Sequence, residues 1–139
     1  MPAMRHAKNS QLVLPRLLNS GSSRYQVESL LGQGYFGTVV KCKNLDDKSI
    51  VAIKMIKLRV DNRKRVNQEV ATLKKLKSLD LSKHNIVQWN QYFIDRGHSC
   101  LEFEHLDRSL LNFMEERKFR PLLVKEIRPI VQQVCPSVF

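Results

Sequence analysis

Three glycines and the residues that follow them restrict the fold of this chain more than any other stretch. Gly32, Gly34 and Gly37 lie in the segment LGQGYFGTVVKC, residues 31–42. Glycine has no Cβ atom, so it lets the backbone come close to a bound group. The β-branched residues of TVVKC predict that a strand, and not a helix, follows the last glycine. We therefore predict a glycine-rich turn between two strands, a structure that often approaches phosphate.

Phosphate-binding loops of three kinds have similar glycine spacing. A Walker A loop needs a lysine directly after its last glycine, but Thr38 follows Gly37 here. A dinucleotide-binding loop needs a helix after the glycines, because the pyrophosphate lies at the helix N-terminus. The third kind is the hairpin G-x-G-x-x-G-x-V of protein kinases, and residues 32–39 match it fully. Glycine hairpins also serve as plain turns, so the loop by itself does not establish that this segment binds phosphate.

A lysine and a glutamate downstream favour the third kind of loop. Lys54 ends the motif VAIK on the next predicted strand, and Glu69 follows it by 15 residues. Glu69 falls in the apolar stripe of a predicted helix over residues 62–79. The stripe consists of Val66, Val70, Leu73 and Leu76. A buried carboxylate without a partner is costly, so we expect Glu69 to pair with Lys54; the alternative is a helix-edge residue that reaches water.

The order of the predicted elements indicates an α+β fold. Strands are expected in YQVESLLGQG, TVVKCKNL, IVAIKMIKL, NIVQWNQYFI and SCLEFEHL, with the helix over 62–79 after the third strand. Ser109 is a plausible N-cap for the next helix. A last helical pattern follows Pro121, with Pro129 inside it as a kink or a late start. Residues 1–24 are polar and mixed, and we expect a flexible leader there.

Composition narrows the class of protein. The chain has 139 residues, of which 42% are hydrophobic and 27% are charged, as in a soluble globular domain. No apolar run is long enough to span a membrane, and the N-terminus does not resemble a secretory signal. The three cysteines are far apart and form no C-x-x-C pair, which indicates no zinc site, no disulfide framework and a reduced intracellular compartment.

The net charge of +11 is concentrated in one region. Residues 54–83 contain ten Lys and Arg against three Asp and Glu. Basic patches can bind nucleic acid or acidic partners. No aromatic residues alternate with these charges and no nucleic-acid motif is present. We therefore expect a solvated helix face and disfavour nucleic-acid binding.

Together the motifs resemble the N-terminal lobe of a eukaryotic protein kinase. The specific combination is LGQGYFGTVVK, VAIK, Glu69 and HNIV at residues 84–87. The chain is most similar to the homeodomain-interacting protein kinases, relatives of the dual-specificity tyrosine-regulated kinases. The stretches CLEFEHLDRSLLNFM and KFRPLLVKEIRPIVQQV and the short spacing from Lys54 to Glu69 support this. The resemblance implies a five-stranded antiparallel sheet with one regulatory helix, a lobe and hinge over 25–106, the start of a second lobe over 107–134, and a divergent tail over 135–139.

The resemblance also implies a site for ATP. The loop would cover the nucleotide with Phe36 at its tip, and Lys54, held by Glu69, would reach the α- and β-phosphates. Val39 and Ala52 would pack on the adenine and Phe103 would be the gatekeeper, although each could be ordinary core. Residues 104–106 would be the hinge. The implied nucleotide-binding residues are Leu31, Gly32, Gln33, Gly34, Tyr35, Phe36, Gly37, Thr38, Val39, Ala52, Lys54, Glu69, Phe103, Glu104 and Leu106.

One residue departs from the family pattern. Glu102 stands on a predicted strand where these kinases usually have an apolar residue. We expect it to face solvent; otherwise it would disturb the packing of the strand.

The chemistry of phosphoryl transfer needs segments that the sequence does not contain. Kinases take their catalytic base and metal ligands from H-R-D-x-x-x-x-N and D-F-G, followed by A-P-E. None of these occurs in the 139 residues. We therefore expect no catalytic residue and no metal ligand, weak ATP affinity, and Mg²⁺ only with the missing segments. The family pattern ends at Cys135, which suggests a truncated product or an incomplete gene model.

Three functions remain open from the sequence. The first is the ATP-binding portion of a serine/threonine protein kinase domain, with catalysis belonging to full-length relatives. The second is a noncatalytic kinase lobe that acts as a protein-interaction module. Its motivation is an apolar stripe on the last helix with nothing to cover it, formed by Leu123, Ile127, Ile130, Val131 and Val134. Nucleic-acid binding is the third and weakest. Substrates and protein partners are not predicted; the location is nucleus or cytoplasm, with nucleus implied by the resemblance.

Overall fold

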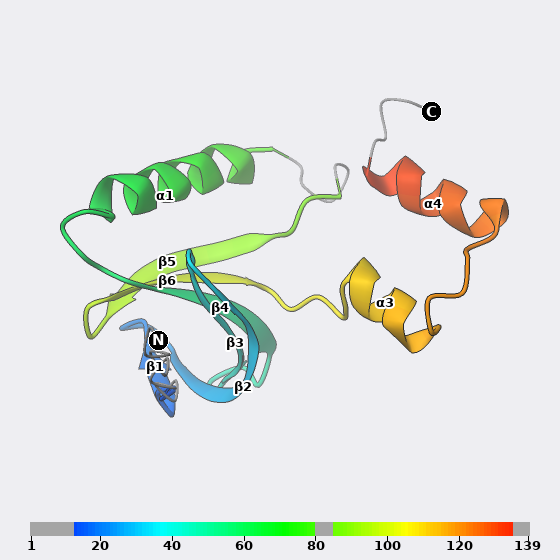
Figure 1. The fold of residues 1–139 in the computed structure, drawn as a ribbon. Helices are drawn as coiled ribbons and strands as arrows, with labels where there is room; N and C mark the ends of the chain where they lie inside the picture. The colour runs from blue at the N-terminus through cyan, green and yellow to red at the C-terminus, as the bar shows by residue number, and fades with distance from the viewer. Residues whose placement is uncertain (1–12, 80–84, 135–139) are drawn as a thin grey trace, which may run out of the picture.

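The main body of the protein is a curled antiparallel sheet with one long helix on one side (Figure 1). The structure is a computed structural model that describes residues 13–79 and 85–134. It has six strands in the order β1-β2-β3-β4-β6-β5, which confirms the predicted α+β class with one more strand than expected. The strands are β1 Leu17–Asn19, β2 Arg24–Gly34, β3 Gly37–Asn44, β4 Ile50–Lys57, β5 Trp89–Asp95 and β6 His98–Glu104.

Apolar side chains fill both faces of this sheet because strand residues alternate between the two faces. On β4, Val51, Ile53 and Met55 join one cluster, whereas Ile56 joins the other. The first cluster lies on the face away from the helix and also contains Leu18, Tyr25, Val40, Cys42, Phe93 and Cys100. Two packed faces explain why β4 reads as a nearly continuous apolar run.

The long helix, α1, covers the second face of the sheet. It spans Arg63–Lys77, slightly shorter than the predicted range of 62–79. Val66 and Val70 are its buried residues and pack with Ile56, Trp89 and Leu101 of the strands. Leu73 is partly buried against the same cluster, and most other positions of the helix are polar, as expected for an amphipathic helix that lies on a sheet. Its packing fixes the side of the sheet toward which Glu69 can point.

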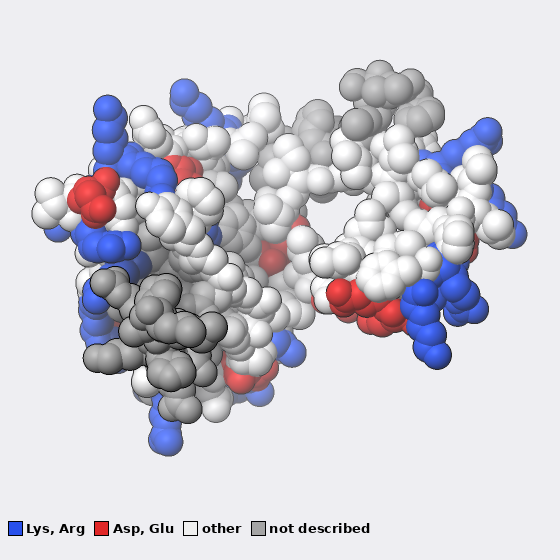
Figure 2. All heavy atoms as spheres, in the orientation of Figure 1, with Lys and Arg blue, Asp and Glu red and all other residues white. Residues whose placement is uncertain are grey.

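Two further helices stand beside the sheet and bury none of their side chains. They are α3, Leu110–Glu116, and α4, Val124–Val134. The Ser109 side chain accepts a hydrogen bond from the Asn112 backbone N–H at 3.1 Å, which confirms the predicted N-cap. Figure 2 shows an opening between these helices and the sheet.

Most of the apolar stripe predicted for the last helix is exposed: Ile130 is half-buried, and the exposed members are Leu123, which precedes α4, and Ile127, Val131 and Val134. The most open of its predicted members is Val134 at 75%; Pro129 lies inside the helix, which begins at Val124. No helix in the described ranges combines the length and the apolar character that a membrane span requires.

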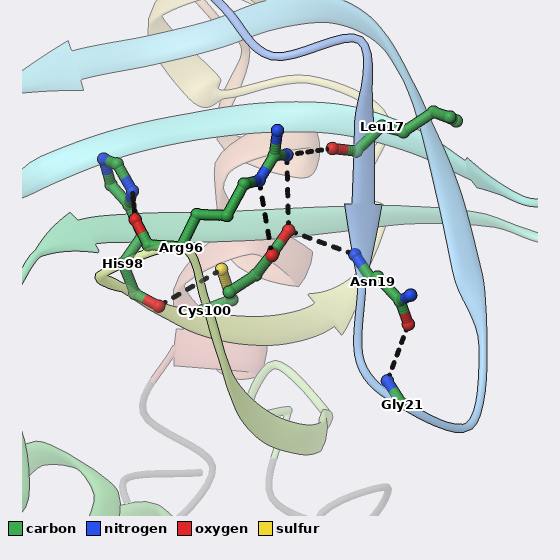
Figure 3. Close-up of polar contacts among 7 residues, drawn as sticks. Leu17, Asn19, Gly21, Arg96, His98 and Cys100 are labelled. Carbon is green, nitrogen blue, oxygen red and sulfur yellow. Dashed lines mark hydrogen bonds and ion pairs between the residues drawn. The ribbon is translucent and has the colours of Figure 1, made fainter.

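The extra strand, β1, lies in the segment where we expected a flexible leader. It pairs antiparallel with β2, and Leu18 is only 1% exposed. The β5–β6 turn holds it: Arg96 Nη2 donates to Leu17 O at 2.5 Å, and the Asn19 N–H donates to Asp95 Oδ2 at 3.2 Å (Figure 3). The structure therefore differs from the expected leader at residues 17–19. Three predicted features lie outside the described residues: the first 12 residues of the leader, His84 of the HNIV motif and the predicted tail.

The expectation that Glu102 faces solvent is wrong. Its side chain is buried in the sheet with a relative exposure of 6%. It lies beside Tyr25, whose hydroxyl also accepts a hydrogen bond from Gln91 Nε2 at 2.5 Å. Burial first, and then the hydrogen bond and charge of Glu102, raise the pKa of Tyr25 to about 12. Tyr25 of β2 and Gln91 of β5, the register partner of Glu102, are polar neighbours of the buried residue, as burial of a carboxylate requires.

Candidate functional site

Lys54 and Glu69 meet between the sheet and α1. Lys54 Nζ lies 2.6 Å from Glu69 Oε1, and the two side chains are 23% and 32% exposed. Lys54 stands in the middle of the sheet, between Val39 of β3 and Leu101 of β6. Burial of Val66 and Val70 orients α1 so that Glu69 faces the strands. The predicted ion pair is therefore present, and water reaches it only in part.

The glycine hairpin lies in register with this lysine. Gly34 pairs with Gly37, which leaves Tyr35 and Phe36 as the turn between β2 and β3. Farther along, Gly32 pairs with Val39, and Val39 pairs with Lys54 on β4. The first glycine and the lysine are thus in one row across three neighbouring strands.

The three glycines of the hairpin have different reasons to be glycine. A Cβ atom on Gly37 would lie 2.7 Å from Met55 O, and Gly37 also has a positive φ of 140°. A Cβ atom on Gly32 or Gly34 would meet no atom within 4 Å. Sequence reasoning gave all three the same role, but Gly37 is required by its close contact with β4. Only Gly32 and Gly34 border open space that a ligand could fill.

The tip of the hairpin points its aromatic rings away from the sheet core. Tyr35 and Phe36 are 88% and 61% exposed. The guanidinium carbon of Arg65 lies 5.1 Å from the centroid of the Phe36 ring, within cation–π range. Arg65 precedes Glu69 by one helical turn, so α1 contacts both the hairpin tip and Lys54. Sequence reasoning missed Arg65, and its four-residue spacing from Glu69 is the signal that could have found it.

The other predicted loop residues lie along the two strands of the hairpin. Leu31 and Gln33 are exposed on β2, and Thr38 is half-buried on β3. These positions place both edges of the loop within reach of solvent.

The residues predicted to contact adenine lie in the next row of the sheet. Ala52 pairs with Lys41 on β3 and with Phe103 on β6. By strand alternation Ala52 and Phe103 share the face of Lys54. Ala52 is 9% exposed, and Phe103 is half-buried against the cluster under α1. The structure thus brings these residues and the ion pair to one face of the sheet.

The predicted hinge, residues 104–106, begins at the last residue of β6. The Glu104 N–H donates to Gln88 O at 3.0 Å, and its carboxylate accepts from the Gln88 N–H at 2.9 Å. Leu106 is 60% exposed in the non-helical segment that follows. Gln88 therefore fixes the end of the strand, a contact that sequence reasoning missed because it involves only backbone groups and one carboxylate.

Comparison with known proteins gives a family match over most of the chain. Residues 25–138 match the family model of the protein kinase domain. The chain is 39% identical over 128 residues to homeodomain-interacting protein kinase 1 of Mus musculus, and the match covers 92% of this chain and 11% of that protein. It is 35% identical over 120 residues to dual specificity protein kinase YAK1 of Saccharomyces cerevisiae, covering 83% and 14%.

A third relative is dual specificity protein kinase CLK4 of Homo sapiens, which is 35% identical over 118 residues. That match covers 84% of this chain and 24% of the relative. The chain therefore spans between a tenth and a quarter of the length of these three proteins.

Proposed function

The chain belongs to the protein kinase domain family, and from that premise we propose that residues 25–106 are the ATP-binding part of a serine/threonine protein kinase domain. The observation that best supports this function is the ion pair between Lys54 and Glu69, with Nζ and Oε1 2.6 Å apart, in register with the glycine hairpin. A structural ion pair alone would not need a glycine that borders open space in the row of Lys54, as Gly32 does, or a second such glycine, Gly34, next to the turn.

The residues of the site fit a nucleotide in chemistry as well as in position. Bound ATP supplies the phosphoryl group that kinases transfer. Glu69 holds the Lys54 ammonium, which retains donors for phosphate oxygens because it has three N–H groups. Gly32 and Gly34 let backbone N–H groups approach the same phosphates.

The adenine base of ATP would lie on the sheet beyond Lys54. Val39, Ala52 and Phe103 offer apolar surface to adenine, and the backbone groups of Glu104 and Leu106 offer its edge a carbonyl and an N–H. This arrangement is typical of nucleotide pockets, in which apolar walls surround a few oriented polar groups.

We further propose that the 139 residues bind ATP weakly and do not transfer phosphate by themselves. They contain no H-R-D, D-F-G or A-P-E segment, and positioning and charge stabilisation by those segments supply most of the acceleration in phosphoryl transfer. Incubation with ATP, Mg²⁺ and a generic basic protein tests this statement. Robust phosphate transfer that Lys54→Ala abolishes would contradict it.

A titration with a fluorescent ATP analogue tests the nucleotide site. We expect Lys54→Met to weaken binding about tenfold or more, because a hydrogen bond to a charged group contributes about 1.5–3 kcal/mol. Glu69→Gln should weaken it less, since that residue acts only by positioning Lys54. Lys74→Met is the matched control, as it removes the same charge from the exposed last turn of α1. Equal affinity for the Lys54 and Lys74 variants would exclude the proposed site.

A noncatalytic interaction module is the second candidate, favoured by the exposed apolar face of α4. Ile127 and Val131 are 41% and 40% exposed although both are core-type residues. Light scattering and pull-down experiments on the chain and on an Ile127→Asp, Val131→Asp variant test it. Monomeric behaviour together with capture of no protein partner would argue strongly against this function. A nuclear location rests on the family resemblance alone and stays a prediction.

A further inference from the structure

A cavity of about 540 Å³ opens at one end of the lobe and shares only the hairpin tip with the proposed nucleotide site. It lies among the hairpin tip, residues 13–18, the end of β4, the start of α1 and the β5–β6 turn. Its lining includes residues 35–38 of the hairpin but neither Lys54 nor Glu69. The proposed function therefore leaves this cavity without a role, and its size is that of a ligand pocket.

The floor of the cavity is apolar and firmly packed. Leu18, Met55 and Ile56 line it and are 1%, 7% and 3% exposed, so they belong to the core of the sheet. Tyr35 and Phe36 contribute aromatic surface at one side. Such a lining favours an apolar side chain of the ligand, because burial of that side chain removes apolar surface from water.

The rim of the cavity is basic. Lys57, Arg59, Arg65 and Arg96 line it, and Asp95 is its single acidic residue. Within residues 13–79 and 85–134, no carboxylate lies within 4.0 Å of a side-chain nitrogen of Lys57, Arg59 or Arg65. Figure 2 shows blue side chains gathered on the side of the molecule where α1 begins. The rim thus has three cations that an anionic ligand could pair.

The start of α1 adds to the positive potential of this rim. Asn62 at the N-cap makes no capping hydrogen bond, because its side chain accepts from the Arg59 N–H at 2.9 Å and donates to Lys57 O at 2.8 Å. The first turn of α1 has no acidic residue. Free N–H groups at a helix start attract anions, and here they border an apolar cavity and the three cations of its rim.

The wall formed by the β5–β6 turn is fixed in place. Arg96 Nε lies 3.3 Å from Asp95 Oδ1, and Arg96 Nη2 also donates to Leu17 O (Figure 3). The single acidic group of the rim is therefore already paired, with both Arg96 and the Asn19 N–H. A fixed wall lowers the ordering cost of binding.

From these contacts we propose that the cavity binds a short acidic segment of a protein partner. An apolar side chain of the segment enters the cavity, and its carboxylates pair with Lys57, Arg59 and Arg65 at the rim. Nucleic acid would satisfy the cations but not the apolar floor. The chain's own residues 1–12 contain Arg5, His6 and Lys8 and no acidic residue, so their charge has the wrong sign.

Fluorescence anisotropy with a labelled hexapeptide, EDFLDE, tests this proposal on the 139-residue chain without nucleotide, so that its failure leaves the ATP proposal untouched. Two control peptides separate the contributions: EDAADE retains only the charge, and QNFLNQ retains only the apolar pair. We expect each control to bind about tenfold more weakly or worse, because the site needs both charge pairing and apolar burial.

A pair of double variants locates the binding site. Lys57→Gln with Arg59→Gln should weaken EDFLDE binding about tenfold. Lys74→Gln with Lys75→Gln is the matched control, because it removes two charges from the far end of α1 and should change affinity less than about twofold. Thermal unfolding of both variants verifies that they remain folded.

Five outcomes would overturn the proposal, the fifth of which concerns residues 1–12. The first is that EDFLDE does not bind. The second is an equal loss of EDFLDE affinity in the two double variants, and the third is an affinity for EDAADE equal to that for EDFLDE. The fourth is that a fluorescein-labelled ten-residue oligothymidine binds more tightly than EDFLDE and is weakened by the Lys57→Gln, Arg59→Gln variant. If EDFLDE binds only after deletion of residues 1–12, the occupant is the chain's own N-terminal segment, and the assignment to a partner is equally wrong.

Discussion

The sheet lobe buries its apolar side chains, whereas the two helices after it leave similar apolar side chains exposed. Among the described residues, every buried apolar side chain lies between Leu18 and Leu101. Helices α3 and α4 bury none, although α4 contains Ile127 and Val131. The strands of the lobe have apolar neighbours on two faces, whereas among the described residues none packs on the apolar side of α4 closely enough to bury its side chains. We infer that the lobe alone accounts for the stability of the chain.

Truncation of a side chain in each region is the strongest test of this comparison. Ile53 is 0% exposed in the sheet, whereas Ile127 is 41% exposed on α4. Ile53→Ala should lower the free energy of unfolding by about 2–5 kcal/mol, because it removes buried methyl groups and leaves a cavity. Ile127→Ala should change it by less than about 0.5 kcal/mol. Urea unfolding measures both, and similar losses would mean that α4 packs on the lobe in solution.

The unexpected strand β1 offers a sharper form of the same test. Leu18 points into the core, and its neighbour Leu17 is 48% exposed. Leu18→Ala should cost about 2–4 kcal/mol of unfolding free energy, whereas Leu17→Ala should cost less than about 0.5 kcal/mol. If both variants unfold at the urea midpoint of the parent chain, β1 is not a stable part of the lobe.

The glycines of the hairpin permit a third comparison inside the lobe. Gly37→Ala places a Cβ atom 2.7 Å from Met55 O at a φ of 140°. We expect a loss of about 1–3 kcal/mol, since both the contact and the dihedral are unfavourable. Gly34→Ala meets no atom within 4 Å and should leave stability nearly unchanged. Thermal unfolding of the two variants distinguishes them, and the opposite order would assign the structural role to the wrong glycine.

The lobe should also lose stability at alkaline pH. Burial is the largest cause that raises the pKa of Tyr25 from 10.0 and of Cys42 and Cys100 from 9.0, each to about 12. The unfolded chain therefore releases these protons first, and the stabilising contribution, complete below pH 9, falls as pH rises from about 9 to 12. Each group contributes a slope of up to about 1.4 kcal/mol per pH unit.

Urea midpoints at pH 8, 9 and 10 measure this fall. The variant Cys42→Ala should show a shallower decline than the parent chain above pH 9, because one of the two buried thiols is gone. A stability that stays constant from pH 8 to 10 in the parent chain would contradict the burial of these groups.

Local patterns predicted most of the fold and the central ion pair. The alternation of Val51, Ile53 and Met55 is readable as a strand, and the spacing of Val66 and Val70 as a helix. Both signals arise from neighbours in sequence, and so does the inward position of Glu69 in the helical stripe.

The features that sequence reasoning missed depend on distant partners. Strand β1 has only three residues, and Asp95 and Arg96 hold it from 76 and 79 residues away. Glu102 is buried beside Tyr25 and Gln91, and these two residues belong to other strands, β2 and β5. The separate role of Gly37 becomes visible only when β4 is placed next to it. These contacts leave no periodic signal in the sequence.

Hydrogen–deuterium exchange with and without ATP tests the central claim most directly, that the sheet lobe is both the stable unit and the nucleotide site. We predict slow exchange in β3, β4 and α1 and fast exchange in α3 and α4, since amides of well-packed elements open rarely. Saturating ATP should slow exchange in residues 31–39 and 52–54, and this protection should be lost in Lys54→Met. Protection of α3 and α4 equal to that of β4, or the same ATP response in Lys54→Met as in the parent chain, would contradict the account.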